Sequence, residues 1–302
     1  MFKIIFLFFL LFTSLYAKEL EKVSIQLQWL DQFQFAGYYV AKEKGFYSDA
    51  GLDVEIKKFD YKMSVLDEVT QGRATYGVGR ASLIIEKSKG VNIKLLASIF
   101  QSSPSILIAL KDSNITNIED FKGKSMMVTS DSASTVSYFA MENKFGISSG
   151  DIVLKEHTFN LNDLIENKVD LISSYISNEP FLLQERGIEY RIFDPKEYGF
   201  DFYSDILFTT NSEMQNYPSR ARDFHHASMA GWRYAFENIE ETVELILEKY
   251  NPQNKSKKAL LFEARALKKL AFYKTNQLGK IDKQNIQSLV YEPAIPRRAL
   301  FQ

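Results

Sequence analysis

The sequence predicts an α/β protein of two lobes, each a mixed, mostly parallel sheet flanked by helices, with a helical C-terminal region. The first observation is length, because 302 residues exceed what one hydrophobic core usually serves, about 250–300 residues. The second is the alternation of β-branched and aromatic runs with segments of helical period, which is typical of helix-covered parallel sheets. The third is composition, since 45 % hydrophobic and 25 % charged residues are globular averages.

The first part of the chain shows this alternation most plainly. Short apolar or alternating runs predict strands at 23–29, 52–59, 76–79, 93–100 and 106–111. Helices are predicted at 36–44, 64–71 and 82–89, with Ser64 as the cap of the second. A glycine follows each helix and can end it in the left-handed conformation, at Gly45, Gly72 and Gly90.

A second series of the same kind begins at Asn117, although no sequence repeat links the two series. Its helices, helical turn and strands are predicted at 117–123, 125–130, 134–145, 160–168, 171–176, 181–186, 190–193 and 205–209. From Ser212 onward the chain is predicted to be almost wholly helical. The three long helices there, at 219–238, 240–250 and 257–273, are separated by polar or proline-containing breaks.

The first 17 residues are predicted to be a signal peptide rather than a part of the fold. Lys3 precedes an unbroken apolar run, and small and polar residues lead to Ala17, the expected cleavage point. The run is shorter than the ~20 residues that span a bilayer, so we expect a secreted, periplasmic protein. Leu15 is bulky for its place before the cleavage point, which keeps an uncleaved signal anchor open as an alternative.

Composition and motifs exclude several classes of function. Lys and Arg number 37 against 38 Asp and Glu, so no basic field exists to hold nucleic acid. The absence of cysteine removes disulfides, thiolate metal sites and thiol nucleophiles. No P-loop, GxGxxG, GxSxG or HExxH motif occurs. We therefore predict no cofactor, no metal and no catalysis.

The loops that follow the predicted strands are the places to look for a ligand site, because α/β sheets bind ligands at the carboxyl ends of their strands. These loops come after Trp29, Gly79, Gln101, Ser130 and Ile176. Polar and aromatic residues collect in them: Trp29, Asp31, Gln32, Gln34, Arg80, Ser82, Gln101, Ser102, Ser103, Asn178 and Glu179.

The stretch LQWLDQFQFAGYYVAKEKGFYSDAGLDVEI, residues 27–56, resembles the opening of the NMT1/THI5-like (SsuA/THI5) family. The resemblance continues through 76–90, 98–115, 175–183, 198–210 and 231–241, so it covers nearly the whole chain after the signal peptide. It implies a type II periplasmic-binding-protein fold, with one lobe from 18–107 and 205–302 and the other from 108–204. It also implies lobes that close on a small ligand: thiamine-precursor pyrimidines above all, or sulfonates, nitrate or flavin in related branches.

Aromatic candidates for the site lie near the end of the first strand. Trp29 matches the tryptophan of the family's LxW motif and could stack on a heteroaromatic ring, unless it packs in the core or at the rim. Phe35 and Tyr38 could supply a second wall, with core packing as the alternative. Tyr203, near the return crossing, could line the cleft or brace the hinge.

Polar candidates come from both lobes. Asn178 and Glu179 belong to the family's NEP motif, and the carboxylate could bind a ring amino group or simply begin a helix. Gln101 and Ser103 end the strand that enters the first crossing, where they could bind a heterocycle edge or face solvent. Arg80 departs from the family pattern and would suit an anion or stack on a ring, with a solvated or paired arginine as the alternative.

The resemblance implies a monomeric solute-binding protein that hands its ligand to an ABC permease, with a thiamine-type pyrimidine favoured. One alternative is a sensor ectodomain, because 267–287 resembles the stretch that leads to a membrane helix in sensor relatives. The other is the pyrimidine synthase, which uses pyridoxal phosphate and a histidine. Phe35 stands where that enzyme carries its histidine, and His157, His225 and His226 lie outside the expected segments.

Overall fold

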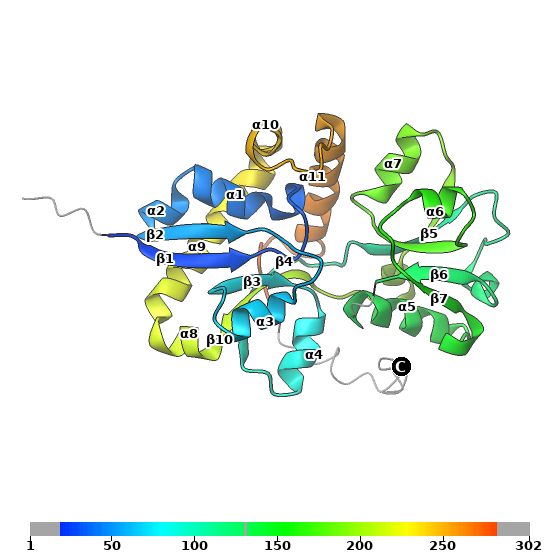
Figure 1. The fold of residues 1–302 in the computed structure, drawn as a ribbon, viewed down its shortest axis with the longest axis horizontal. Helices are drawn as coiled ribbons and strands as arrows, with labels where there is room; N and C mark the ends of the chain where they lie inside the picture. Colours follow the sequence, from blue (N-terminus) through cyan, green and yellow to red (C-terminus); the bar gives the residue numbers. More distant parts are fainter. Residues whose placement is uncertain (1–18, 130–131, 283–302) are drawn as a thin grey trace, which may run out of the picture.

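Two five-stranded sheets form the framework of the computed structural model, which describes residues 19–129 and 132–282 (Figure 1). The predicted signal peptide, 1–17, lies outside the described residues. The strands are β1 (Glu21–Gln26), β2 (Leu52–Lys57), β3 (Tyr76–Gly79), β4 (Ile93–Phe100), β5 (Ser105–Leu110), β6 (Ser125–Val128), β7 (Val153–Glu156), β8 (Leu171–Tyr175), β9 (Tyr190–Phe193) and β10 (Ser204–Thr210).

The order of strands is β2-β1-β3-β10-β4 in the first sheet and β7-β6-β8-β5-β9 in the second. In the first sheet, β10 runs antiparallel to both of its neighbours, while β1 pairs in parallel with β2 and β3. In the second, β5 is the reversed strand, and β6 pairs in parallel with β7 and β8. The predicted mixed, mostly parallel sheets are therefore confirmed.

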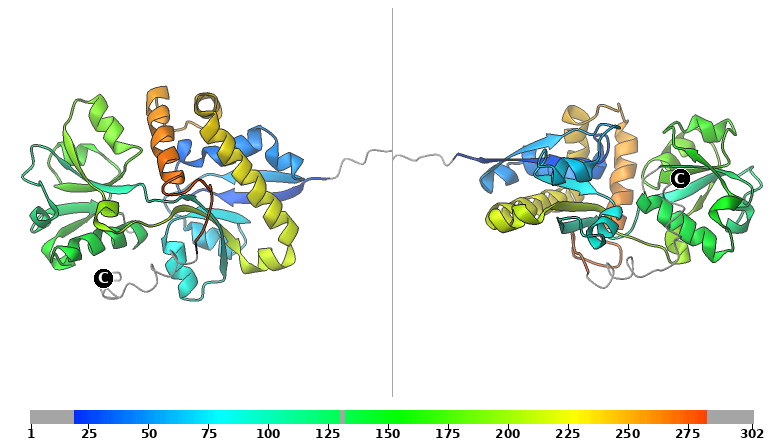
Figure 2. Two further views of the ribbon diagram at one scale, coloured as in Figure 1. Left: turned by 180° about the vertical axis from the view of Figure 1, so that it is seen from behind. Right: turned by 60° about the horizontal axis from the view of Figure 1, so that its bottom comes forward.

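Helices flank both sheets (Figures 1 and 2). They are α1 (Ala36–Glu43), α2 (Phe46–Asp49), α3 (Val65–Thr70), α4 (Ser82–Ser88), α5 (Ser132–Lys144), α6 (Asn162–Ile165), α7 (Glu179–Glu185), α8 (Asn211–Asn216), α9 (Pro218–Glu237), α10 (Ile239–Lys249) and α11 (Lys257–Ala271). The core on one face of the first sheet joins it to α1, α9, α10 and α11, and a smaller core on the other face includes α3 and α4. The second sheet is packed on both faces in the same way, by α5 on one side and by α6 and α7 on the other.

The closest helix packing in the first lobe occurs where α1 crosses α9. A Cβ atom on Gly231 would lie 2.1 Å from the carbonyl oxygen of Gly37, and one on Gly37 would lie 2.1 Å from Cγ of Trp232. Two glycines facing each other therefore let the helix backbones touch, with the fully buried Trp232 ring beside them. This contact fixes α1, and with it the segment that leads from β1 into the cleft.

Several elements begin or end differently from the prediction. The first strand ends at Gln26, where its pairing with β2 and β3 stops, so Trp29 lies in the bend that follows. The helix α2, which was not predicted, follows Gly45. The left-handed conformation of Gly45, with a φ of 82°, separates α2 from α1. α7 begins at Glu179 rather than at Phe181, because Pro180 fits the first turn of a helix.

The chain crosses between the sheets twice, within 101–104 and within 194–203. Asp201 joins the two crossings, since its Oδ1 accepts hydrogen bonds from Ser102 Oγ at 2.9 Å and from Ser103 N at 3.0 Å. A boundary at 107/108 would divide β5, whose partners β8 and β9 both belong to the second sheet. We therefore propose that the lobes divide within these two crossings.

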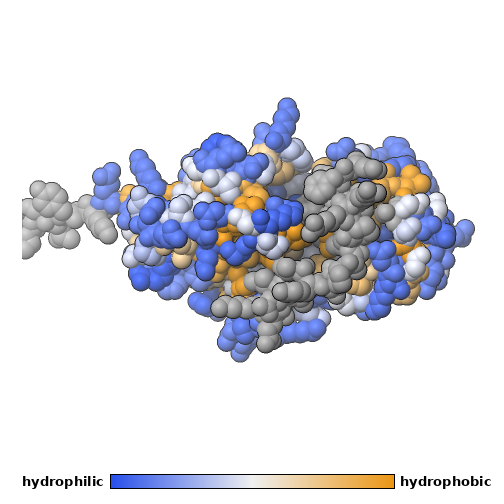
Figure 3. All heavy atoms as spheres, turned by 90° about the horizontal axis from the view of Figure 1, so that it is seen from below, coloured by the Kyte–Doolittle hydropathy of each residue, from blue (hydrophilic) through white to orange (hydrophobic). Residues whose placement is uncertain are grey.

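On the face that Figure 3 shows, hydrophilic residues alternate with patches of hydrophobic ones. The large hydrophobic side chains that are exposed are Leu20, Tyr61, Val153, Leu154, Phe159, Leu182 and Tyr217. Within 19–129 and 132–282, the helices all fall short of the length and hydrophobicity that a membrane span requires.

Candidate functional site

A cavity lies between the two lobes, and we call it the inner compartment. From the first lobe it is lined by Trp29, Gln32, Gln34 and Arg80. The second lobe contributes Ser105, Thr129, Tyr138, His157, Phe159, Ser173, Ser174, Tyr175, Asn178 and Glu179. Most of these residues lie at or just beyond the carboxyl ends of β1, β3, β6, β7 and β8, which is where open α/β sheets place their ligands.

Aromatic rings from both lobes meet at the mouth of this compartment. The Trp29 ring lies 4.9 Å from that of Phe159, measured between centroids, and the two planes are tilted by 54°. Phe59 and Tyr61 extend the cluster on the first lobe, with centroids 5.2 and 5.6 Å from that of Trp29. Phe159 is 46 % exposed and Tyr61 59 %, so these rings are available to a ligand.

His157 is fixed in one tautomer within the second-lobe wall. Its Nδ1 accepts a hydrogen bond from Phe159 N at 2.9 Å, so the proton sits on Nε2, which donates to Ser173 O at 2.8 Å. Burial lowers the pKa of the ring, which favours the neutral form. The imidazole also stacks on Phe159 with centroids 4.6 Å apart. Both nitrogens are occupied, so only the ring face can contact a ligand.

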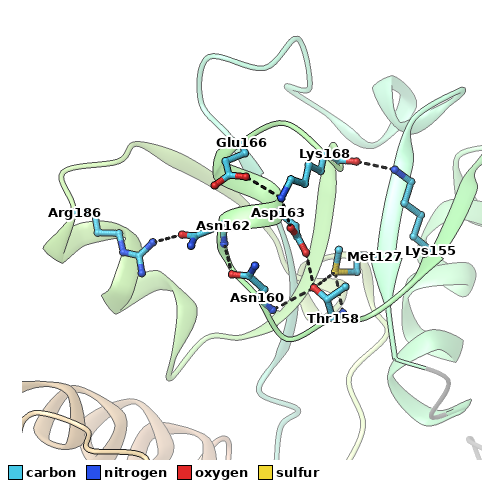
Figure 4. A network of polar contacts seen from close by, with 9 residues as sticks. All are labelled: Met127, Lys155, Thr158, Asn160, Asn162, Asp163, Glu166, Lys168 and Arg186. Atoms are coloured by element: carbon cyan, nitrogen blue, oxygen red, sulfur yellow. Dashed lines mark hydrogen bonds and ion pairs between the residues drawn. The ribbon is translucent and has the colours of Figure 1, made fainter.

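The loop that carries Phe159 is held by a polar network (Figure 4). Phe159 has a φ of 59°, a left-handed conformation that is unfavourable for a bulky side chain. On either side, Thr158 Oγ1 donates to Asp163 Oδ2 at 2.6 Å and accepts from Asn160 N at 3.3 Å. Lys168 binds Asp163 Oδ1 at 3.1 Å. The network therefore maintains a strained backbone that presents the Phe159 ring to Trp29.

Side-chain amides form the polar part of the first-lobe wall. Gln34 donates from Nε2 to Asp205 Oδ1 at 3.1 Å, and its Oε1 accepts from Gln32 Nε2 at 2.7 Å. Gln28 Nε2 donates to the same Asp205 oxygen at 2.5 Å. These contacts fix the orientation of each amide group. Burial raises the pKa of Asp205 to about 7, against the opposing effect of the amide hydrogen bonds and of the Arg80 charge.

Arg80 and Glu179 are the charged side chains that line the compartment. Arg80 Nε donates to the Tyr175 hydroxyl at 3.3 Å, across the two lobes. Glu179 Oε2 accepts from Tyr175 N at 2.9 Å. Burial raises the pKa of the Glu179 carboxyl, and the hydrogen bond from Tyr175 partly opposes that shift.

A second link between the lobes runs through Lys255. Its Nζ donates to Asn178 Oδ1 at 2.5 Å in the second lobe and lies 3.0 Å from Glu263 Oε2 in the first. Glu263 is buried, and its other oxygen accepts from Gln34 N at 2.9 Å. The lobes therefore make polar contact at the rim as well as aromatic contact at the mouth.

Four of the nine residues proposed from sequence come together around the inner compartment: Trp29, Arg80, Asn178 and Glu179. Phe35 and Tyr38 instead lie in the core of the first lobe, fully buried, with the Tyr38 ring 5.7 Å from that of Trp232. Both side chains point into the core because they lie on the face of this segment that packs against the first sheet. An aromatic residue near a strand end does not by itself reveal which face of the next helix it occupies.

The other three proposed residues belong to the crossing region. Gln101 Nε2 donates to Ser98 O and Lys280 O, both at 2.9 Å. Ser103 binds Asp201 through its backbone N–H. The Tyr203 hydroxyl accepts from Asp282 N at 3.0 Å. None of the three is among the described residues that line the cavity, and their contacts brace the hinge instead.

Sequence reasoning did not select the second-lobe wall beyond Asn178 and Glu179. Thr129 and Ser173 to Tyr175 sit at the ends of predicted strands, so the strand-end rule could have found them. His157 and Phe159 gave no such signal. No residue range was predicted for β7, the strand that precedes them, and the loop after β7 is shaped by tertiary contacts. For metals, the chain within 19–129 and 132–282 holds no group of three or more potential ligands among Asp, Glu and His.

Two α/β lobes joined by two crossings, with a lined cavity between them, define the periplasmic-binding-protein fold. The chain belongs to the NMT1/THI5-like family, whose model matches residues 32–242. The aliphatic sulphonate binding protein SsuA of Escherichia coli has the same fold, with a TM-score of 0.70 at 11 % identity, covering 89 % of this chain and 84 % of that one. A ligand-binding component of an ABC-type import system from Staphylococcus aureus matches with a TM-score of 0.65 at 17 % identity, covering 89 % of this chain and 91 % of that one.

Among curated relatives, the riboflavin-binding protein RibY of Chloroflexus aurantiacus is 25 % identical over 76 % of this chain and 66 % of its own length. The formylaminopyrimidine-binding protein of Halalkalibacterium halodurans is 22 % identical over 78 % of this chain and 72 % of its own. The chain thus spans just under two thirds of the RibY protein.

Proposed function

We propose that this protein is a secreted, periplasmic receptor that captures a small planar nitrogen heterocycle and delivers it to an ABC permease. The observation that carries the proposal is the pair of rings, Trp29 and Phe159, that approach from opposite lobes at 4.9 Å. A flat ring that enters between them as the lobes move apart gains stacking on both faces.

Polar groups around the inner compartment suit the edge of such a ring. Gln32 and Gln34 offer amide donors and acceptors in fixed orientations, and Glu179 offers an acceptor for a ring amino group. A thiamine-type pyrimidine, with its amino group and ring nitrogens, is therefore the favoured ligand. The names of two relatives, which refer to riboflavin and to a formylaminopyrimidine, agree with this chemistry.

The contacts of His157 favour a receptor over the synthase-type enzyme. A histidine that takes part in that chemistry needs a reactive ring nitrogen, whereas both nitrogens of His157 are hydrogen-bonded in the wall. His157 is the histidine that lines this compartment in the described chain. Binding without turnover is the function that its geometry supports.

Isothermal titration of the purified protein with thiamine-type pyrimidines, flavins, sulfonates and nitrate tests the proposal. We expect a heterocycle to bind, and Trp29→Ala to weaken it by about tenfold to a hundredfold through lost stacking and burial. Tyr217→Ala, which removes an exposed ring outside the cleft, is the control and should leave binding unchanged. Binding of sulfonates or nitrate alone, insensitive to Trp29→Ala, contradicts the proposal.

A further inference from the structure

Asp205, on β10, is a buried carboxyl group whose placement destabilises the fold. Its side chain is fully buried, and its φ of 50° is a left-handed conformation that is unusual within a strand. Its Oδ2 atom has no hydrogen-bond partner among the residues that the structure describes. Strain and an unpartnered buried oxygen both cost free energy, and residues that carry such costs cluster at functional sites.

The hydrogen bonds that Asp205 accepts lead to the ligand wall. Its Oδ1 accepts from Gln34 Nε2 at 3.1 Å and from Gln28 Nε2 at 2.5 Å. Gln34 lines the inner compartment, and its backbone N–H donates to the buried Glu263 carboxylate at 2.9 Å. Two buried carboxyl groups therefore hold Gln34, one at its side chain and one at its backbone.

An ionised carboxyl group sets the direction of a chain of amides because it only accepts hydrogen bonds. Gln34 must turn its Nε2 towards Asp205, which leaves its Oε1 to accept from Gln32 Nε2 at 2.7 Å. The Oε1 of Gln32 then lies 3.5 Å from Nε2 of Gln253, in the segment between α10 and α11. An amide at position 205 would allow the chain to run in either direction, since an amide both donates and accepts.

We propose that Asp205 is a positioning residue for ligand binding, which sets through Gln34 and Gln32 the direction in which the ligand wall offers its donors and acceptors. This inference rests on the proposed ligand site in the inner compartment. Gln32 and Gln34 line that compartment, whereas Asp205 is not among the described residues that do. Its effect on a ligand is therefore transmitted by the amides.

The charge on Asp205 depends on its burial and on Arg80. Burial raises the pKa of the carboxyl to about 7, and Arg80, which follows β3, favours the ionised form. Tyr38, on α1, also acts on Asp205, but burial raises the pKa of its hydroxyl well above 10, so it stays neutral. Ser98 and Phe100, which face this part of β10 from β4, have no ionisable group.

Asp205→Asn tests the inference, because asparagine keeps the shape, tolerates a left-handed backbone and loses the fixed direction. We expect opposite effects on stability and on binding. At pH 8 the midpoint of thermal unfolding should rise, since no buried charge remains. Affinity for 4-amino-5-hydroxymethyl-2-methylpyrimidine or riboflavin, measured by isothermal titration at the same pH, should fall about threefold to tenfold.

The pH dependence of binding gives a second measurement. In the unaltered protein, affinity should fall as the pH is lowered from about 8 to about 6, because protonation removes the charge that strengthens the amide hydrogen bonds. Glu179 and His157 also line the compartment, but any titration of these groups or of the ligand persists in Asp205→Asn. The part of the pH dependence that the variant loses therefore belongs to Asp205.

A double-mutant cycle with Gln34→Ala tests the path of the effect. If Asp205 acts through Gln34, most of the affinity lost in Asp205→Asn should disappear when Gln34 is already alanine. Asp170→Asn is a matched control, because Asp170 Oδ2 accepts from Ser125 N at 2.8 Å and from Ser125 Oγ at 2.6 Å. Asp170 precedes β8 at the end of the strand away from the cleft, so this variant should leave affinity unchanged.

The outcomes separate the inference from the function on which it rests. If no heterocycle binds, both the proposed function and the role of Asp205 are overturned. If heterocycles bind but Asp205→Asn leaves affinity and its pH dependence unchanged, or weakens binding equally with and without Gln34, only the role of Asp205 is overturned. Loss of stability together with affinity would also overturn it, since Asp205 would then belong to the framework of the first lobe.

Discussion

Glu142, on α5, is a buried carboxyl group whose two oxygens have no hydrogen-bond partner within the described part of the chain. Burial raises its pKa to about 8 from an ordinary value near 4.5. Because the unfolded chain ionises this group more easily than the folded protein does, Glu142 destabilises the fold increasingly as pH rises from about 4.5 to 8.

Glu142→Gln should therefore stabilise the protein, and the gain should grow with pH. At pH 7 we expect an increase in the free energy of unfolding of roughly 2–4 kcal/mol, against a gain near zero at pH 4. Urea unfolding of both proteins at several pH values measures this gain. Glu119→Gln, at an exposed position, is the control and should show no such trend. If Glu142→Gln changed the free energy of unfolding equally at pH 4 and pH 8, the pKa of the Glu142 carboxyl would not be raised in the folded protein.

Particular residues show how far the sequence could predict the site. Trp29 and Arg80 lie just past β1 and β3, two strands that the local sequence pattern predicts. Asn178 and Glu179 belong to a recognisable motif. Phe35 and Tyr38 could not be separated from Trp29, because all three are aromatic and follow the same strand. Phe159 could not be predicted at all, since its position depends on a left-handed backbone and on loop hydrogen bonds that no local sequence pattern indicates.

At the scale of elements, the loop between β7 and α6 couples the second lobe's surface to the cleft. Its hydrogen bonds involve Thr158, Asn160 and Asp163, none of which lines the inner compartment. In the proposed site we therefore expect them to act on a ligand only through Phe159. Strand and helix positions followed from local patterns to within a few residues, whereas this loop's conformation depends on contacts between elements.

Thr158→Val tests that coupling, because valine keeps the shape of threonine and loses the hydroxyl that bonds to Asp163 and Asn160. We expect ligand affinity to fall about threefold to tenfold as Phe159 loses its fixed position, with a change of about 1 kcal/mol in unfolding free energy. Thr116→Val is a matched control, since Thr116 Oγ1 also donates to an aspartate, Asp120, at 2.9 Å. It should cost similar stability and leave affinity unchanged. Equal affinities for both variants would argue against the coupling.

At the scale of the whole molecule, the lobes meet through contacts that opening would break. They include the Trp29–Phe159 ring contact, the Arg80–Tyr175 hydrogen bond and the bond from Lys255 to Asn178. The Asp201 contacts, by contrast, lie between the crossings and can persist while the lobes move. We therefore expect one set of groups to serve the hinge and another to hold the lobes closed.

Asn178→Ala removes one closing contact and should shift the unliganded protein towards an open form. We expect a larger radius of gyration by small-angle X-ray scattering than for the unaltered protein, and a larger contraction when ligand is added. Asn92→Ala, which removes a side chain bonded to Asn211 within the first lobe, is the control. An unchanged radius of gyration in Asn178→Ala would show that this contact does not hold the lobes together.

The place of β10 in the first sheet has a consequence for how the chain folds. β10 lies between β3 and β4 in the sheet, yet it follows them in the sequence by more than 100 residues. Every strand of the second sheet, by contrast, comes from one continuous segment of the chain. Contacts between distant parts of a chain form slowly because long loops must close first. We therefore expect the second lobe to gain hydrogen-exchange protection during refolding while the first lobe is still open at the gap that β10 fills.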